Sequence, residues 1–288
     1  MKRKLFGLVL IGLLFAVCGC THKPLKRNTS EYIYENYEHP DNITVIQTSK
    51  ILSVKVKSEK ESWQVAYNPE KDNEKYYSAW EVTEGYSFAR MADISQVGRL
   101  FEAVGKLTEI AESHVENWDN DNNTEEKSIV VFYEAEGEIL SIKMNLNQAY
   151  SMVPELEEFT SFSLILKLPL IKNLEDIKRI DLSWDNKDVQ LIRKRHHWYL
   201  GKKEIAEEEA KDLYQIIIGI LLQGETDTRS DYSDTPYLTV SFVEKSGQET
   251  KIEYINMDER KCNVRIDQTE EFWVRREDVD KIISAFSD

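Results

Sequence analysis

The sequence predicts an α+β protein made of two tandem modules, each an antiparallel sheet with a helix packed on one face, behind an N-terminal signal peptide. Three observations lead to this fold class. Short segments alternate apolar and polar residues, which is typical of half-buried strands. Two longer segments space their apolar residues by three and four positions, as amphipathic helices do. The same order of segments then occurs twice along the 288 residues.

The composition indicates a folded globular chain. Hydrophobic residues make up 41% and charged residues 31%, with only 11 Gly and 6 Pro, so the chain can bury a core and is neither disordered nor fibrous. The 52 acidic residues exceed the 37 Lys and Arg, which gives a formal net charge of -15. Such a charge argues against nucleic-acid binding, because phosphate backbones would repel the protein.

Residues 1–19 predict a signal peptide. Three basic residues at positions 2–4 precede an uncharged apolar run over residues 5–17. This run is shorter than the roughly 20 apolar residues that a membrane-spanning helix needs. We therefore expect the run to be removed on export and the mature chain to have no transmembrane helix.

The end of this segment reads Val17-Cys18-Gly19-Cys20 and resembles the lipobox of bacterial lipoproteins. The resemblance implies cleavage before Cys20 and a diacylglyceryl group on its sulfur. Two acyl chains would hold a soluble domain stably at the membrane. The alternative is that Cys18 and Cys20 are only apolar residues at an ordinary cleavage site. Cys20 is the single modified residue that the sequence predicts.

Residues 20–42 predict a flexible tether. They show no steady period and contain Pro24 and Pro40. Acylated Cys20 would leave Cys262 alone, so we expect no internal disulfide, and Cys262 is expected to be a small apolar strand residue.

The first module is predicted over residues 43–172, and its elements follow in order. The expected strands are residues 51–56, 63–67 and a segment beginning at 80–82; a helix is expected over 94–110, a hairpin over 128–144 and a closing strand over 163–168.

The second module is predicted over residues 173–288 with the same order of elements. The expected strands are residues 177–182, 189–192 and 197–200, followed by a helical stretch over 205–222 and a hairpin over 239–254. Matched landmarks, among them Trp80 with Trp198 and Leu100 with Leu213, lie roughly 110 to 118 residues apart. Tandem duplication explains this match better than chance alternation. Trp80 and Trp198 are therefore expected in the two cores.

The assembled pattern resembles the bacterial lipoproteins that carry domain of unknown function 4340. The residues that carry this resemblance are Trp80-Glu81-Val82 and Trp198-Tyr199-Leu200, the helix and hairpin after each, and residues 272–283, which fit a last strand that enters a short helix. The resemblance covers about residues 50–288. It implies an accessory role in the cell envelope beside an ABC transport system, and it implies no catalytic residues.

No segment carries a recognised catalytic or cofactor motif: the sequence has no Gly-rich phosphate loop, no Gly-x-Ser-x-Gly and no His-Glu-x-x-His. We therefore expect no catalytic, metal-binding or cofactor-binding residue. Residues 119–125 hold oxygen side chains but lack the Gly and final Glu of an EF-hand, so a solvated loop is expected, with weak calcium binding as the alternative.

Two further clusters lie next to each other. His196 and His197 have no third ligand nearby, and neighbouring strand residues face opposite sides, so a zinc site is not expected. The basic run Arg193-Lys194-Arg195 is interpreted as a solvated hairpin turn, with an anionic partner as the alternative.

We expect a membrane-anchored envelope lipoprotein that is a non-catalytic binding or accessory module and not an enzyme. Its expected contacts are the membrane, through Cys20, and another envelope protein, without nucleic acid. The anchor would lie in the outer face of the cell membrane or in an outer membrane. The alternative is a lipoprotein that binds a solute or glycan in the groove between the modules. An envelope hydrolase would need a nucleophile beside a base, which no motif supplies.

Overall fold

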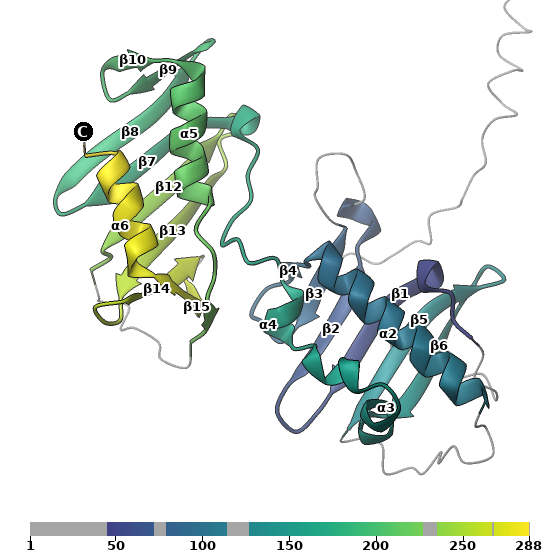
Figure 1. Ribbon diagram of the computed structural model, residues 1–288. Coiled ribbons are helices and arrows are strands. Elements are labelled where there is room, and N and C mark those ends of the chain that lie inside the picture. The colour runs from purple at the N-terminus through teal and green to yellow at the C-terminus, as the bar shows by residue number, and fades with distance from the viewer. Residues whose placement is uncertain (1–44, 72–78, 114–126, 227–234, 267, 288) are drawn as a thin grey trace, which may run out of the picture. The chain divides into compact units, whose positions relative to one another are not determined.

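The computed structural model describes residues 45–71, 79–113, 127–226, 235–266 and 268–287, which contain two antiparallel sheets and a small number of helices (Figure 1). The predicted α+β class is confirmed.

The first sheet has six strands in the order β4-β3-β2-β1-β5-β6. Its strands are β1 (Ile51–Lys57), β2 (Ser62–Tyr67), β3 (Trp80–Glu84), β4 (Arg90–Met91), β5 (Ser128–Ala135) and β6 (Glu138–Asn145). Helix α2 (Ile94–Ser113) crosses one face of this sheet (Figure 1). Five of the apolar residues that predicted this helix are buried against the sheet: Val97, Leu100, Phe101, Val104 and Leu107. Ile110 is partly buried, and Ile94, at the first turn, is exposed.

The chain after β6 is helical and not extended. It forms α3 (Leu146–Met152), the 3₁₀ turn η4 (Pro154–Glu158) and α4 (Ser161–Leu164). The strand expected over 163–168 is therefore wrong. Thr160 Oγ1 accepts from the Ser163 N–H at 3.0 Å, and Ser163 Oγ accepts from the Thr160 N–H at 2.8 Å. This capping box starts a helical turn, and only Ile165 forms an isolated bridge, with Ala92.

The second sheet has nine strands in the order β10-β9-β8-β7-β12-β13-β14-β15-β11. Its strands are β7 (Ile177–Trp184), β8 (Lys187–Lys194), β9 (His197–Leu200), β10 (Lys203–Ile205), β11 (Gly224–Glu225), β12 (Leu238–Glu244), β13 (Glu249–Asn256), β14 (Lys261–Ile266) and β15 (Thr269–Arg275). The remaining short turns are η1 (Thr48–Lys50), η2 (Pro69–Lys71) and η5 (Leu174–Asp176).

Two helices lie on one face of the second sheet, α5 (Glu207–Ile218) and α6 (Arg276–Ala285) (Figure 1). Helix α5 buries Leu213 and Ile217, and α6 buries Val279 and Ile282. The sequence predicted one helix for this face and attached the second, short helix to the last strand. Helix α5 contacts β9, and α6 contacts β14 and β15, so the two helices cover different strands of the sheet.

Strand pairing follows the same path in both sheets. In the first sheet β1 pairs with β2 and β5, and β5 pairs with β6. In the second sheet β7 pairs with β8 and β12, and β12 pairs with β13. Of the two tryptophans expected in the cores, Trp198 is buried, with 3% of its surface exposed, and Trp80 is partly buried and packs against the core. The Trp80 ring packs on the Phe101 ring at a centroid distance of 4.8 Å.

Candidate functional site

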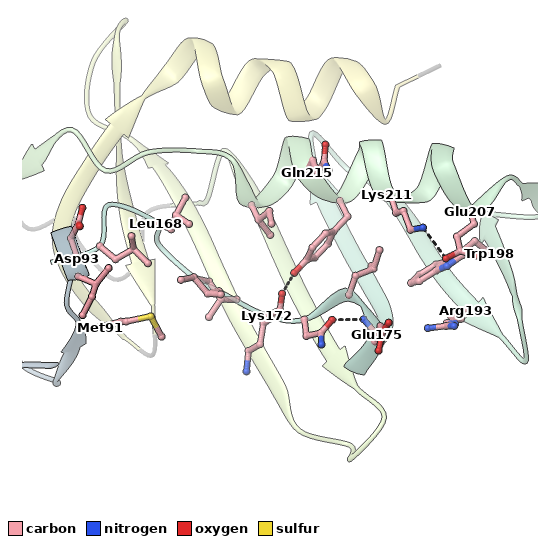
Figure 2. A pocket seen from close by; sticks show the side chains of 18 of the residues that line it. Met91, Asp93, Leu168, Lys172, Glu175, Arg193, Trp198, Glu207, Lys211 and Gln215 are labelled. Carbon is pink, nitrogen blue, oxygen red and sulfur yellow. Dashed lines mark hydrogen bonds and ion pairs between the residues drawn. The ribbon is translucent and has the colours of Figure 1, made fainter. Parts of the chain in front are cut away.

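A pocket of about 750 Å³ opens beside helix α5 (Figure 2). We call it the α5 pocket. Its walls are α5, the segment 166–175, which is irregular up to η5, and the paired strands β8 and β9, with residues 91–94 closing one end. Figure 2 shows Met91 and Asp93 at one end of the pocket and Arg193 and Trp198 at the other.

Hydrogen bonds hold segment 166–175 along its length. The Leu166 N–H donates to the Met91 carbonyl at 2.8 Å, and the Leu222 N–H donates to the Lys167 carbonyl at 2.7 Å. Further along, the Tyr214 hydroxyl of α5 donates to the Lys172 carbonyl. Because main-chain groups make these bonds, the side chains of the segment are free to line the pocket.

Most of the lining is apolar. Segment 166–175 supplies five half-buried aliphatic side chains, and α5 supplies Tyr214 and Ile218 on the opposite wall. The aliphatic residues of the segment are Leu166, Leu168, Leu170, Ile171 and Leu174. A run of five aliphatic side chains that stays only half-buried leaves apolar surface available to a ligand.

The charged groups of the lining are mostly engaged within the protein. Lys172 Nζ lies 2.6 Å from Glu244 Oε1, and Lys211 Nζ lies 3.1 Å from Glu207 Oε1. Burial would raise the pKa of the Asp93 carboxyl, but hydrogen bonds from the Ser95 side chain and from the backbone at residues 95 and 96 hold that pKa below its usual range. Asp93 thus serves as a cap at the start of α2.

Arg193 differs from these groups. Strand register pairs Arg193 of β8 with Trp198 of β9, so both side chains lie on the face that α5 covers. The guanidinium carbon lies 5.7 Å from the centre of the Trp198 ring. Its Nε is buried and has no hydrogen-bond acceptor among the described residues, and no carboxylate of the described chain forms an ion pair with it. Arg193 is therefore an unneutralised cation in the wall of the α5 pocket.

The other predicted clusters lie elsewhere. Cys20 and residues 119–125 fall outside the described residues. His196 and His197 are exposed at the β8–β9 turn, and His197 Nδ1 lies 2.7 Å from Glu204 Oε1. Lys194 and Arg195 are exposed, as expected for a turn. Of the basic run, only Arg193 lines the pocket.

Cys262 has the role that the sequence predicted. It is 0% exposed in β14, and burial raises the pKa of its thiol to about 12. Such a thiol is not a nucleophile at neutral pH.

The described ranges lack two features. No group of three or more His, Cys, Asp or Glu side chains is placed there to hold a metal ion. No helix within the same ranges is long and apolar enough to cross a membrane.

The α5 pocket was not expected at the residue level, because the sequence assigned residues 163–168 to a strand and Arg193 to a turn. The aliphatic run over residues 164–174 is the sequence signal that could have indicated it. Comparison of the chain with protein-family models, with curated proteins and with solved structures gave no match.

Proposed function

We propose that the protein is a lipid-anchored envelope lipoprotein whose two sheets form a non-catalytic binding module, and that binding takes place at the α5 pocket. Covalent or acid–base catalysis needs a nucleophile within hydrogen-bond reach of a base. The described lining of the pocket includes no Ser, Thr, Cys or His, and it is mainly aliphatic with one unneutralised cation. This lining carries the proposal, because it suits recognition of a ligand.

The anchor follows from the N-terminal sequence. Basic residues, an apolar run and Val17-Cys18-Gly19-Cys20 occur in that order, which supports lipidation of Cys20. A lipid at Cys20 would keep the module outside the cytoplasm, at the cell membrane or at an outer membrane.

We further propose that residues 43–172 and 173–288 are tandem copies of one module and that the chain is related to the lipoproteins with domain of unknown function 4340. The shared path of strand pairing in the two sheets supports duplication. The proposed relation to these lipoproteins also supports another envelope protein, part of an ABC transport system, as the binding partner.

The alternative function is binding of a solute or glycan in the α5 pocket. Its volume of about 750 Å³ lies within the roughly 300–1,000 Å³ of small-molecule sites, and Trp198 forms part of its wall. A photo-crosslinker at Leu170, used in living cells, separates the two functions. An adduct of protein size supports a protein partner, and an adduct of small mass supports a solute.

Replacement of the lipidated residue tests the anchor. Cys20→Ala removes the sulfur that would carry the diacylglyceryl group, so we expect the protein to leave the membrane fraction. Cys18→Ala is the matched control and should stay in the membrane fraction, because a small residue is tolerated at that lipobox position. Retention of Cys20→Ala in washed membranes would refute the anchor.

A further inference from the structure

Arg193 is the cation of the α5 pocket lining that has no ion-pair partner among the described residues; the lining also includes the carboxylate of Glu175, which is exposed to solvent. Lys172 and Lys211, the other cations of the lining, lie within 2.6 Å and 3.1 Å of carboxylate oxygens. In the described chain, no acidic side chain pairs with Arg193, and its buried Nε lacks an acceptor. A buried donor without an acceptor costs free energy that a bound acceptor would recover.

The chemistry of Arg193 selects the acceptor. A guanidinium presents a planar fork of N–H donors that matches the two oxygens of a carboxylate or phosphate, and it stacks on aromatic rings more readily than an ammonium does. The Trp198 ring lies against one face of this guanidinium, with its centre 5.7 Å from the guanidinium carbon. An oxyanion can therefore approach the side that faces the pocket.

The remainder of the pocket selects an apolar body. The lining includes the aliphatic side chains of Leu168, Leu170, Ile171 and Leu174. Figure 2 shows Leu168 and Met91 at the end of the pocket away from Arg193. Each methylene buried against such a wall favours binding, because apolar surface leaves water. A glycan would instead require several polar side chains that converge on its hydroxyls.

The acidic end must be recognised at short range. The formal net charge of -15 repels anions at a distance, so the protein as a whole does not attract an acidic ligand. Selectivity for an acid over a neutral molecule of the same length would then depend on Arg193 alone. Replacement of Arg193 is therefore a direct test of this selectivity.

We propose that the α5 pocket binds an amphiphile that has one alkyl chain and one acidic head group, with the chain along segment 166–175 and the acid on Arg193. This inference rests on the alternative function proposed above, binding of a small molecule in the α5 pocket, and names the class of ligand. A membrane anchor at Cys20 would place the protein where such molecules occur.

Isothermal titration with chain-matched probes tests this assignment. The protein is the full mature chain from residue 20, with Cys20→Ala so that no detergent is needed. The probes are decanoate, decyl phosphate and decanol, each below its micelle concentration at pH 8. We expect the preferred acid to bind at least tenfold tighter than decanol. The two acids distinguish a carboxylate head group from a phosphate head group, and either preference supports the inference.

Two arginine variants locate the recognition. Arg193→Met should reduce the affinity for the acid to that for decanol and leave decanol binding within twofold. Arg195→Met is the matched control, because Arg195 is exposed at the turn two residues away, and it should keep the wild-type preference. Circular dichroism and thermal unfolding of both variants show that the fold is kept.

Three results would overturn the inference: equal affinity of the wild type for acid and alcohol, an acid preference that survives in Arg193→Met, or no binding of any probe. None of these affects membrane retention through Cys20 or a protein-sized adduct at Leu170. Failure of the inference is thus distinguishable from failure of the proposed function.

Discussion

Lys167 stands at the start of the pocket wall in a half-buried position. Its Nζ lies 3.9 Å from the centre of the Phe162 ring and donates to the Ile165 carbonyl at 3.2 Å. Burial lowers the pKa of this lysine from 10.5 to about 8, while the negative charges of Asp93 and Glu225 act in the opposite direction. The folded protein therefore releases this proton at a lower pH than the unfolded chain does.

The lowered pKa of Lys167 predicts a pH dependence of stability. Between about pH 8 and pH 10.5 the unfolded chain binds more protons at this residue than the folded protein, so its contribution to the free energy of unfolding rises with pH. Lys167→Met should remove this rise, and Lys60→Met, at an exposed position, should keep it. Urea titrations at pH 7, 8, 9 and 10 measure both. Parallel pH profiles for wild type and Lys167→Met would contradict the expectation.

Single residues show where the sequence suffices and where it does not. The buried state of Cys262 was predictable because Cys262, Val264 and Ile266 alternate with polar residues, as one face of a strand does. Arg193 was not, since its neighbours in sequence are basic and predict a turn. Register decides its position: pairing with Trp198 turns its side chain under α5, while Lys194 and Arg195 stay in solvent.

At the scale of elements, each sheet depends on the apolar face of a long helix. Leu100 of α2 is 0% exposed, and Leu213 of α5 is 8% exposed. Both residues belong to the apolar face that the spacing of three and four residues creates, and this face packs against the sheet. Burial of these faces, more than helix propensity, holds helices of this length in place.

Truncation of these two side chains tests the packing. Leu100→Ala and Leu213→Ala should each lower the free energy of unfolding by about 2 to 5 kcal/mol, through lost transfer energy and the cavity left behind. Leu221→Ala is the control, because Leu221 is 46% exposed, and it should cost less than about 0.5 kcal/mol. Guanidinium titrations give all three values. Losses at Leu100 or Leu213 as small as that at Leu221 would show that the helix does not pack as described.

The long elements could be predicted because their period repeats over enough residues. Apart from the strand expected over 163–168, the predicted strands, the two amphipathic helices and both hairpins lie within a few residues of their bounds in the structure. Strands β4, β10 and β11 have only two or three residues, which is too short for a period. At residues 161–164 a capping box outweighs an apolar pattern, because local hydrogen bonds decide the first helical turn.

At the scale of the whole molecule, strand pairing does not pass from one sheet to the other. All strands of the first sheet lie within residues 51–145, and all strands of the second lie within 177–275. The sheet orders depend on pairing between distant segments, so the sequence could supply the elements but not the order. Residues 166–175, which follow α4 and line the α5 pocket, lie between the last strand of the first sheet and the first strand of the second.

Separate expression of the second sheet tests its independence. The fragment 165–288 contains every strand of that sheet, both of its helices and the pocket segment, so we expect it to unfold in one cooperative transition. The fragment 173–288 should also fold but with lower stability, because it lacks the Lys172 carbonyl that accepts from Tyr214 and the Lys172 side chain that pairs with Glu244. Urea titrations monitored by circular dichroism compare the two. A chain 165–288 without cooperative unfolding would show that the second sheet requires the first.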